Sequence, residues 1–128
     1  MKTANILIVE DDVWLAEQYD RLLTKSGYKV YTALHPLAAI EMIDIIDGPI
    51  AVMILDVLLT GSTAFALMHE LRSYKDTSDI PIILCTNLAK ELSMDNLKPY
   101  GVMTLLDKVE IKPSDLVRSV QELIHEND

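Results

Sequence analysis

The chain has 128 residues, a length typical of one domain, and half of its residues are hydrophobic. Its 20 acidic and 11 basic side chains give a formal net charge of −9, which argues against a basic nucleic-acid-binding face. The single cysteine, Cys85, excludes a disulfide within the chain and a zinc site built on paired thiolates. No apolar run is long enough for a membrane span and no signal-peptide pattern is present, so we expect a cytoplasmic protein without membrane contact.

Apolar runs and helical patterns alternate from the start of the chain. The first half predicts, in order, a strand at 6–9, a helix at 13–25, a strand at 29–33, a helix that opens at Pro36 and is broken at 47–49, and a strand at 51–55. The strand-like runs are rich in β-branched residues and lack polar alternation. This pattern is typical of strands covered on both faces.

The second half of the chain continues the alternation. It predicts a loop through Gly61, a helix carrying Phe65, Met68 and Leu71, a strand at 80–85, a weaker helix at 88–97, a strand at 102–106, and an amphipathic helix carrying Leu116, Val120 and Leu123. Strict alternation of strands and helices predicts an α/β fold: a five-stranded parallel sheet with right-handed crossovers and helices on both faces. Without a repeat or linker, we expect residues 1–128 to form a single domain.

Charged and polar side chains follow four of the five predicted strands. Glu10 and Asp11 follow the first strand, Asp56 the third, Thr86 the fourth and Lys108 the fifth. Ligands of open parallel sheets bind beyond the carboxyl ends of the strands. The sequence therefore predicts that these side chains share one rim.

Carboxylates held together repel one another, and a hard divalent cation relieves the repulsion. Mg²⁺ prefers about six oxygen ligands and keeps several waters, so two carboxylates and a carbonyl suffice. We expect Asp11, Asp56 and the backbone carbonyl of Leu58 to be the ligands, with Glu10 holding a metal-bound water. A carboxylate can also attack phosphorus, and Lys108 and Thr86 would then stabilise the transferring phosphoryl oxygens.

Four segments together resemble the motifs of response-regulator receiver domains of two-component signalling. They are Ile-Leu-Ile-Val-Glu-Asp-Asp at 6–12, Met-Ile-Leu-Asp-Val-Leu-Leu-Thr-Gly at 53–61, Ile-Pro-Ile-Ile-Leu-Cys-Thr at 80–86 and Leu-Leu-Asp-Lys at 105–108. Each motif alone is weakly specific. Their order and spacing carry the resemblance, which covers essentially the whole chain. Within this family, the chain is similar to the chemotaxis regulators.

The resemblance implies a (βα)5 flavodoxin-like receiver fold with Asp56 as phosphoacceptor. Glu10 and Asp11 would form the acidic pocket for Mg²⁺, and Thr86 and Lys108 would contact the phosphoryl group. The donor would be a sensor histidine kinase or a histidine phosphotransfer protein. The domain would catalyse only its own phosphorylation and hydrolysis, and so would not be a turnover enzyme. Phosphorylation would switch contacts with an unidentified downstream protein, with no output domain in this chain.

Four positions depart from the family pattern. Val109 replaces the usual proline after the lysine, and Leu105 replaces the usual aromatic residue three positions before it. Thr60 stands where proline is usual before Gly61, and 63–64 is Thr-Ala where Asp-Gly is common. The leucine disfavours switching by an aromatic flip. A lysine-proline pair also occurs at 112–113, but it lies beyond the predicted strand, so Lys108 is taken as the lysine of the motif.

Each highlighted residue also has a purely structural explanation. The acids at 10–12 suit a helix start, with Asp12 the candidate cap. Asp56 can be a loop carboxylate, Thr86 a turn residue and Lys108 a solvated charge. Outside this set, Trp14 is expected to pack on the first helix and Cys85 to fill the core.

Two other functions compete with the phosphoacceptor hypothesis. A degenerate receiver would act as an interaction module without phosphorylation. The departures at Leu105 and Val109 leave this alternative open, but the full set of five site residues argues against it. A haloacid-dehalogenase-like phosphatase would also use an aspartyl nucleophile, but it needs a second acid two residues later. That position is Leu58, so the sequence disfavours this enzyme.

Overall fold

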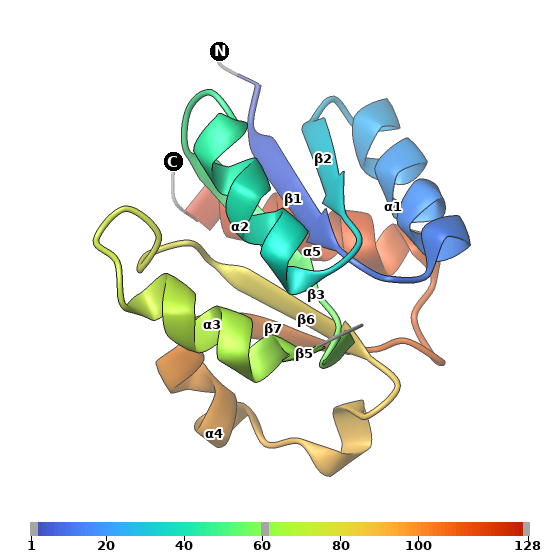
Figure 1. The fold of residues 1–128 in the computed structure, drawn as a ribbon. Coiled ribbons are helices and arrows are strands. Elements are labelled where there is room, and N and C mark those ends of the chain that lie inside the picture. Colours follow the sequence, from blue (N-terminus) through green and yellow to red (C-terminus); the bar gives the residue numbers. More distant parts are fainter. Residues whose placement is uncertain (1–2, 60–61, 127–128) are drawn as a thin grey trace.

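Five parallel strands in the order β2-β1-β3-β6-β7 form the sheet of the computed structural model, which describes residues 3–59 and 62–126 (Figure 1). The strands are β1 (Asn5–Val9), β2 (Lys29–Ala33), β3 (Ile50–Leu55), β6 (Ile82–Thr86) and β7 (Val102–Asp107). The predicted five-stranded parallel sheet is confirmed, and the predicted strand ends differ from the observed ones by two residues at most.

Helices cover both faces of the sheet. They are α1 (Val13–Lys25), α2 (Pro36–Ile45), α3 (Ala64–Arg72), α4 (Met94–Leu97) and α5 (Pro113–Glu126). In Figure 1, α2 and α3 lie in front of the sheet and α5 lies behind it. Within the described part of the chain, no helix is both long enough and apolar enough to cross a membrane.

The core is divided by the sheet into two clusters. Ile6 and Ile8 of β1 point to the face where α1 and α5 pack, whereas Leu7 and Val9 point to the face of α2 and α3. Successive side chains of a strand face opposite sides, so a central strand covered on both sides buries every residue. Burial stabilises each such side chain by about 1.5–3 kcal/mol relative to exposure.

Helix α1 begins and ends at the residues that the sequence predicts. Asp12 is the N-cap, and its Oδ1 accepts a hydrogen bond from the Leu15 N–H at 3.1 Å. After the helix, Gly27 adopts φ 100°, a left-handed conformation that glycine takes without steric cost. Trp14, which was expected to pack on this helix, is 68% exposed.

The single helix predicted over 88–97 is wrong. The segment forms a 3₁₀ turn η1 (Ala89–Glu91), the short helix α4, and a second 3₁₀ turn η2 (Lys98–Tyr100). Leu92 and Ser93 between them have extended backbones. Leu88, Leu92 and Leu97 still pack against the α2/α3 side of the core, so burial of this segment does not require a continuous helix.

A two-stranded antiparallel ribbon between β3 and α3 was not predicted. It consists of β4 (Leu58–Leu59) and β5 (Ser62–Thr63), with Leu58 paired to Thr63. Thr60 and Gly61, part of the proposed phosphoacceptor motif, lie outside the described residues.

Arg72 at the end of α3 ties this helix to the sheet. Its Nε donates to the carbonyl of Tyr100 at 2.9 Å, and an Nη donates to the carbonyl of Ile80 at 2.7 Å. The two carbonyls precede β7 and β6. Hydrogen bonds from a charged donor are stronger than neutral ones, so this side chain fixes α3 against the starts of β6 and β7.

Candidate functional site

Four of the predicted site residues meet at the carboxyl edge of the sheet. Glu10 follows β1, Asp56 follows β3, Thr86 ends β6, and Lys108 follows β7. These strands are consecutive neighbours in the sheet. Parallel register places Val9 beside Leu55 and Thr86 beside Asp107. Residues nearly a hundred positions apart in the sequence therefore lie at one rim.

Lys108 joins the two buried carboxylates of the rim. Its Nζ donates to Asp56 Oδ2 at 2.6 Å and also forms an ion pair with Glu10 Oε1. The Lys108 side chain is 12% exposed and that of Glu10 is 3% exposed. Buried charges are stable only when paired and hydrogen-bonded, so the lysine and the two acids depend on one another.

The electrostatics of this group leave an excess of negative charge. Burial raises the pKa of Glu10 above its ordinary value, even though its contacts with Lys108 and the Asp12 N–H act in the opposite direction. Burial acts to lower the pKa of Lys108, but its bonds to Asp56 and Glu10 outweigh that effect and raise it. Lys108 is therefore charged at neutral pH, and one lysine serves two buried carboxylates.

Asp11 lies beside Glu10 at the solvent side of the rim. Its side chain is exposed, and its contact with Glu10 raises the pKa of Glu10 further. Leu58, the proposed carbonyl ligand, opens β4 two residues after Asp56. Across residues 3–59 and 62–126, no three side chains of the His, Cys, Asp and Glu types form a ready-made metal cage.

Thr86 is held in place through its backbone and its hydroxyl. The residue is 1% exposed, and its Oγ1 accepts a hydrogen bond from the Leu88 N–H at 3.2 Å. Its carbonyl accepts from the Lys108 N–H at 3.0 Å. A hydroxyl that accepts one hydrogen bond can still donate its own proton. Thr86 is thus fixed next to Lys108, and its hydroxyl can still donate a hydrogen bond.

Tyr19 and Cys85 form a buried contact beneath the rim that sequence reasoning missed. The Tyr19 hydroxyl lies 3.5 Å from Cys85 Sγ. Burial raises the pKa of both groups, so neither is ionised at neutral pH. Cys85 is buried, which confirms it as core filler.

The loops that border the rim are joined by a surface ion pair, which was also not predicted. Lys90 Nζ lies 2.9 Å from Glu110 Oε1, and both side chains are exposed. Exposed pairs of this kind contribute little to stability. In the same loop, the Val109 N–H donates to Asp107 Oδ1 at 3.0 Å, a bond that proline could not make.

A doubly wound parallel sheet with acids, a threonine and a lysine at its strand ends defines a class of α/β proteins. The model of the response regulator receiver domain matches residues 6–121 of the chain. The chain therefore belongs to the response-regulator receiver family of two-component signalling, and its fold is the (βα)5 flavodoxin-like receiver fold.

Individual relatives agree with this assignment. The probable transcriptional regulator ycf29 of Porphyra purpurea is 28% identical over 123 residues, which is 94% of this chain and 56% of that protein. This chain thus spans about half the length of such curated relatives. A sensor protein from Polaromonas sp. JS666 superposes with a TM-score of 0.86 at 28% identity, over 98% of each chain.

A third relative shares the fold at lower identity. The response regulator TrrA from Thermotoga maritima, solved in complex with Mg(2+)-BeF, has a TM-score of 0.78 and 24% identity, covering 94% of this chain and 99% of that one.

Proposed function

We propose that this chain is a working phosphoacceptor, in which Asp56 takes a phosphoryl group from the phosphohistidine of a sensor histidine kinase or histidine phosphotransfer protein. The observation that carries the proposal is the bond of 2.6 Å between Asp56 Oδ2 and Lys108 Nζ at a rim that also holds Glu10 and Thr86. Together these side chains supply a nucleophile, a cation and a hydroxyl donor, the groups that phosphoryl transfer to a carboxylate uses.

The proposed step is an in-line transfer onto Asp56. A carboxylate oxygen of Asp56 attacks the phosphorus, the phosphorus–nitrogen bond breaks, and the leaving imidazole keeps the electron pair and takes up a proton. Lys108 moves its hydrogen bond from the carboxylate to a phosphoryl oxygen. The Thr86 hydroxyl donates to a second phosphoryl oxygen.

The residues of the rim fit a Mg²⁺ ion. Asp11, Asp56 and the Leu58 carbonyl would be its ligands, and Glu10 would hold a metal-bound water. Two buried carboxylates share one lysine, and the exposed Asp11 can meet a hydrated ion. An ion that keeps several waters does not need a cage of three side chains. When bound, Mg²⁺ would neutralise charge on the phosphoryl oxygens.

The proposed output is a change in protein contacts. Phosphorylation would shift a two-state equilibrium at the face of α4, β7 and α5. Leu105 packs here against the core in place of an aromatic side chain, so the shift would proceed by aliphatic repacking. We propose residues 1–128 as one receiver unit in the cytoplasm that phosphorylates only itself and contacts a protein target, with no nucleic acid bound by this chain.

Intact-mass analysis after incubation with acetyl phosphate, with and without Mg²⁺, tests the proposal. We expect one base-labile phosphoryl adduct that requires Mg²⁺ and is absent from Asp56→Asn. The exposed Asp95→Asn variant is the matched control and should be labelled like the wild type. Labelling of Asp56→Asn would disprove the assignment. A folded wild type that never forms the adduct would instead favour a phosphorylation-independent interaction module.

A further inference from the structure

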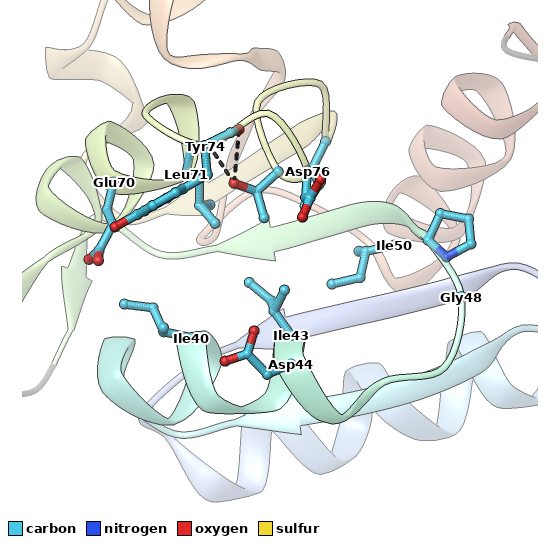
Figure 2. A pocket seen from close by; sticks show the side chains of 12 residues that line it. Ile40, Ile43, Asp44, Gly48, Ile50, Glu70, Leu71, Tyr74 and Asp76 are labelled. Carbon is cyan, nitrogen blue, oxygen red and sulfur yellow. Dashed lines mark hydrogen bonds between the residues drawn. The ribbon is translucent and has the colours of Figure 1, made fainter.

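A cavity of about 670 Å³ opens between α2 and α3 (Figure 2). Ile50, the first residue of β3, lies in its wall, whereas Asp56 follows the last residue of the same strand. The cavity is therefore separated from the phosphoacceptor site by the full length of a strand.

The floor of the cavity is apolar. Ile40 and Ile43 reach into it from α2, and Leu71 faces them from α3 (Figure 2). Thr77 also lines the wall, but its hydroxyl donates to the Leu71 carbonyl at 2.6 Å. This wall therefore favours an apolar group, and the Thr77 hydroxyl is held in an internal hydrogen bond.

The rim of the cavity carries three carboxylates, Asp44, Glu70 and Asp76. In the described part of the chain, none of the three forms an ion pair, and no Lys, Arg or His lines the cavity. The guanidinium of Arg72 donates to backbone carbonyls instead. Tyr74, which is 61% exposed, adds an aromatic face at the same rim (Figure 2).

We propose that this cavity binds a small organic cation with an apolar body and one ammonium or guanidinium group. Its volume lies within the range of small-molecule sites, which are mostly apolar with a few polar groups. The apolar floor accepts the body, the unpaired carboxylates attract the charge, and the ring of Tyr74 can lie against the cation. The site uses no residue of the phosphoacceptor rim, so it acts whether or not Asp56 accepts phosphoryl.

The test is a titration of ¹⁵N-labelled protein with 4-phenylbutylammonium, followed by amide chemical shifts. The neutral 4-phenylbutan-1-ol and the anionic 4-phenylbutyrate are matched probes with the same apolar body. We expect shifts centred on α2, α3 and Tyr74, an affinity order of cation, alcohol, anion, and weaker cation binding at high salt. Equal affinity of the cation and the alcohol, or shifts centred elsewhere, would overturn the proposal.

Two variants separate charge from shape. Glu70→Gln should weaken binding of the cation by about twofold to fivefold and leave the alcohol unchanged, as for an exposed ion pair. Glu17→Gln on α1 removes the same charge far from the cavity, and it should change the affinity for neither the cation nor the alcohol. If both variants lost the same affinity for the cation, the attraction would depend only on the net charge of the protein, and the proposed site would be refuted. Binding of a lysine–leucine peptide without binding of the amine would replace it with a peptide-docking surface.

Discussion

One lysine between two buried carboxylates is the central feature at the scale of single residues. Lys108 contacts Glu10 and Asp56, and all three side chains are largely buried. Removing one partner from a buried ionic group costs more than the group contributes, because the remaining charges have neither water nor a counter-ion. Stability and chemistry at this rim are therefore linked.

Replacing Lys108 with methionine should lower the free energy of unfolding by about 3–5 kcal/mol at pH 7, because two carboxylates stay buried without their cation. Urea denaturation measures the loss. Lys90→Met is the control, since Lys90 forms only an exposed pair and its loss should cost at most about 1 kcal/mol. Equal losses in the two variants would show that the buried pairing contributes nothing special.

Glu10 should make stability depend on pH. Burial raises its pKa in the folded chain above the ordinary 4.5, so the folded chain holds this proton at pH values where the unfolded chain has lost it. The free energy of unfolding then falls as pH rises from 4.5 through the folded pKa. Glu10→Gln lacks this decline and should become more stable relative to the wild type over that window. Urea titrations across the window should diverge; parallel curves would contradict the raised pKa.

Sequence reasoning found the residues that follow strands and missed pairs formed between distant segments. Glu10, Asp56, Thr86 and Lys108 come together because parallel strands end at one edge. The contact of Tyr19 with Cys85 and the pair of Lys90 with Glu110 follow from packing and loop shape, which no local pattern encodes. The metal-ligand roles of Asp11 and Leu58 stay predictions.

At the scale of secondary structure, local signals decided which elements could be predicted. Helix α1 has a polar cap, a regular apolar face and a glycine stop, and both of its ends were predicted correctly. The segment 88–100 has apolar residues at near-helical spacing, but Ser93 and Pro99 are start and stop signals inside it, and it divides into two 3₁₀ turns and one short helix. The ribbon of β4 and β5 is too short to show any periodicity.

The N-cap of α1 offers a test at this scale. Asp12→Ala removes the acceptor of the Leu15 N–H and should cost about 1 kcal/mol of stability. Asp12→Ser keeps a capping oxygen without the charge, and it should cost much less. Thermal or urea unfolding of the three proteins measures the difference. Similar losses for alanine and serine would mean that the charge of Asp12, not its hydrogen bond, stabilises the helix.

At the scale of the whole molecule, the sheet separates two apolar cores. The strand pattern predicted this arrangement, because runs such as 6–9 lack the polar alternation of a sheet with one wet face. What the pattern could not give is which helix covers which face, because an apolar helix surface does not say on which side of the sheet it packs. The structure places α1 and α5 on one face and α2 and α3 on the other.

Shortening one buried side chain on each side of the sheet would create two small cavities, and their effects on the free energy of unfolding should be independent. Ile6→Val lies in the α1/α5 core and Ile82→Val in the α2/α3 core, and each should cost about 0.5–1.5 kcal/mol. Because the two side chains share no partner, the double variant should lie within about 0.5 kcal/mol of the sum. Urea denaturation gives all three values. A larger deviation would mean that the sheet transmits strain between the cores.

The order of the rim residues along the chain has a consequence for biosynthesis. Glu10 and Asp56 leave the ribosome well before Lys108, which follows the last strand to join the sheet. Until β7 docks beside β6, the two acids have no lysine partner and favour an open, hydrated rim over a buried one. Ribosome-bound chains stalled before β7 would thus hold the acceptor aspartate without the group that orients it, and competence to receive a signal would arise only once β7 has docked.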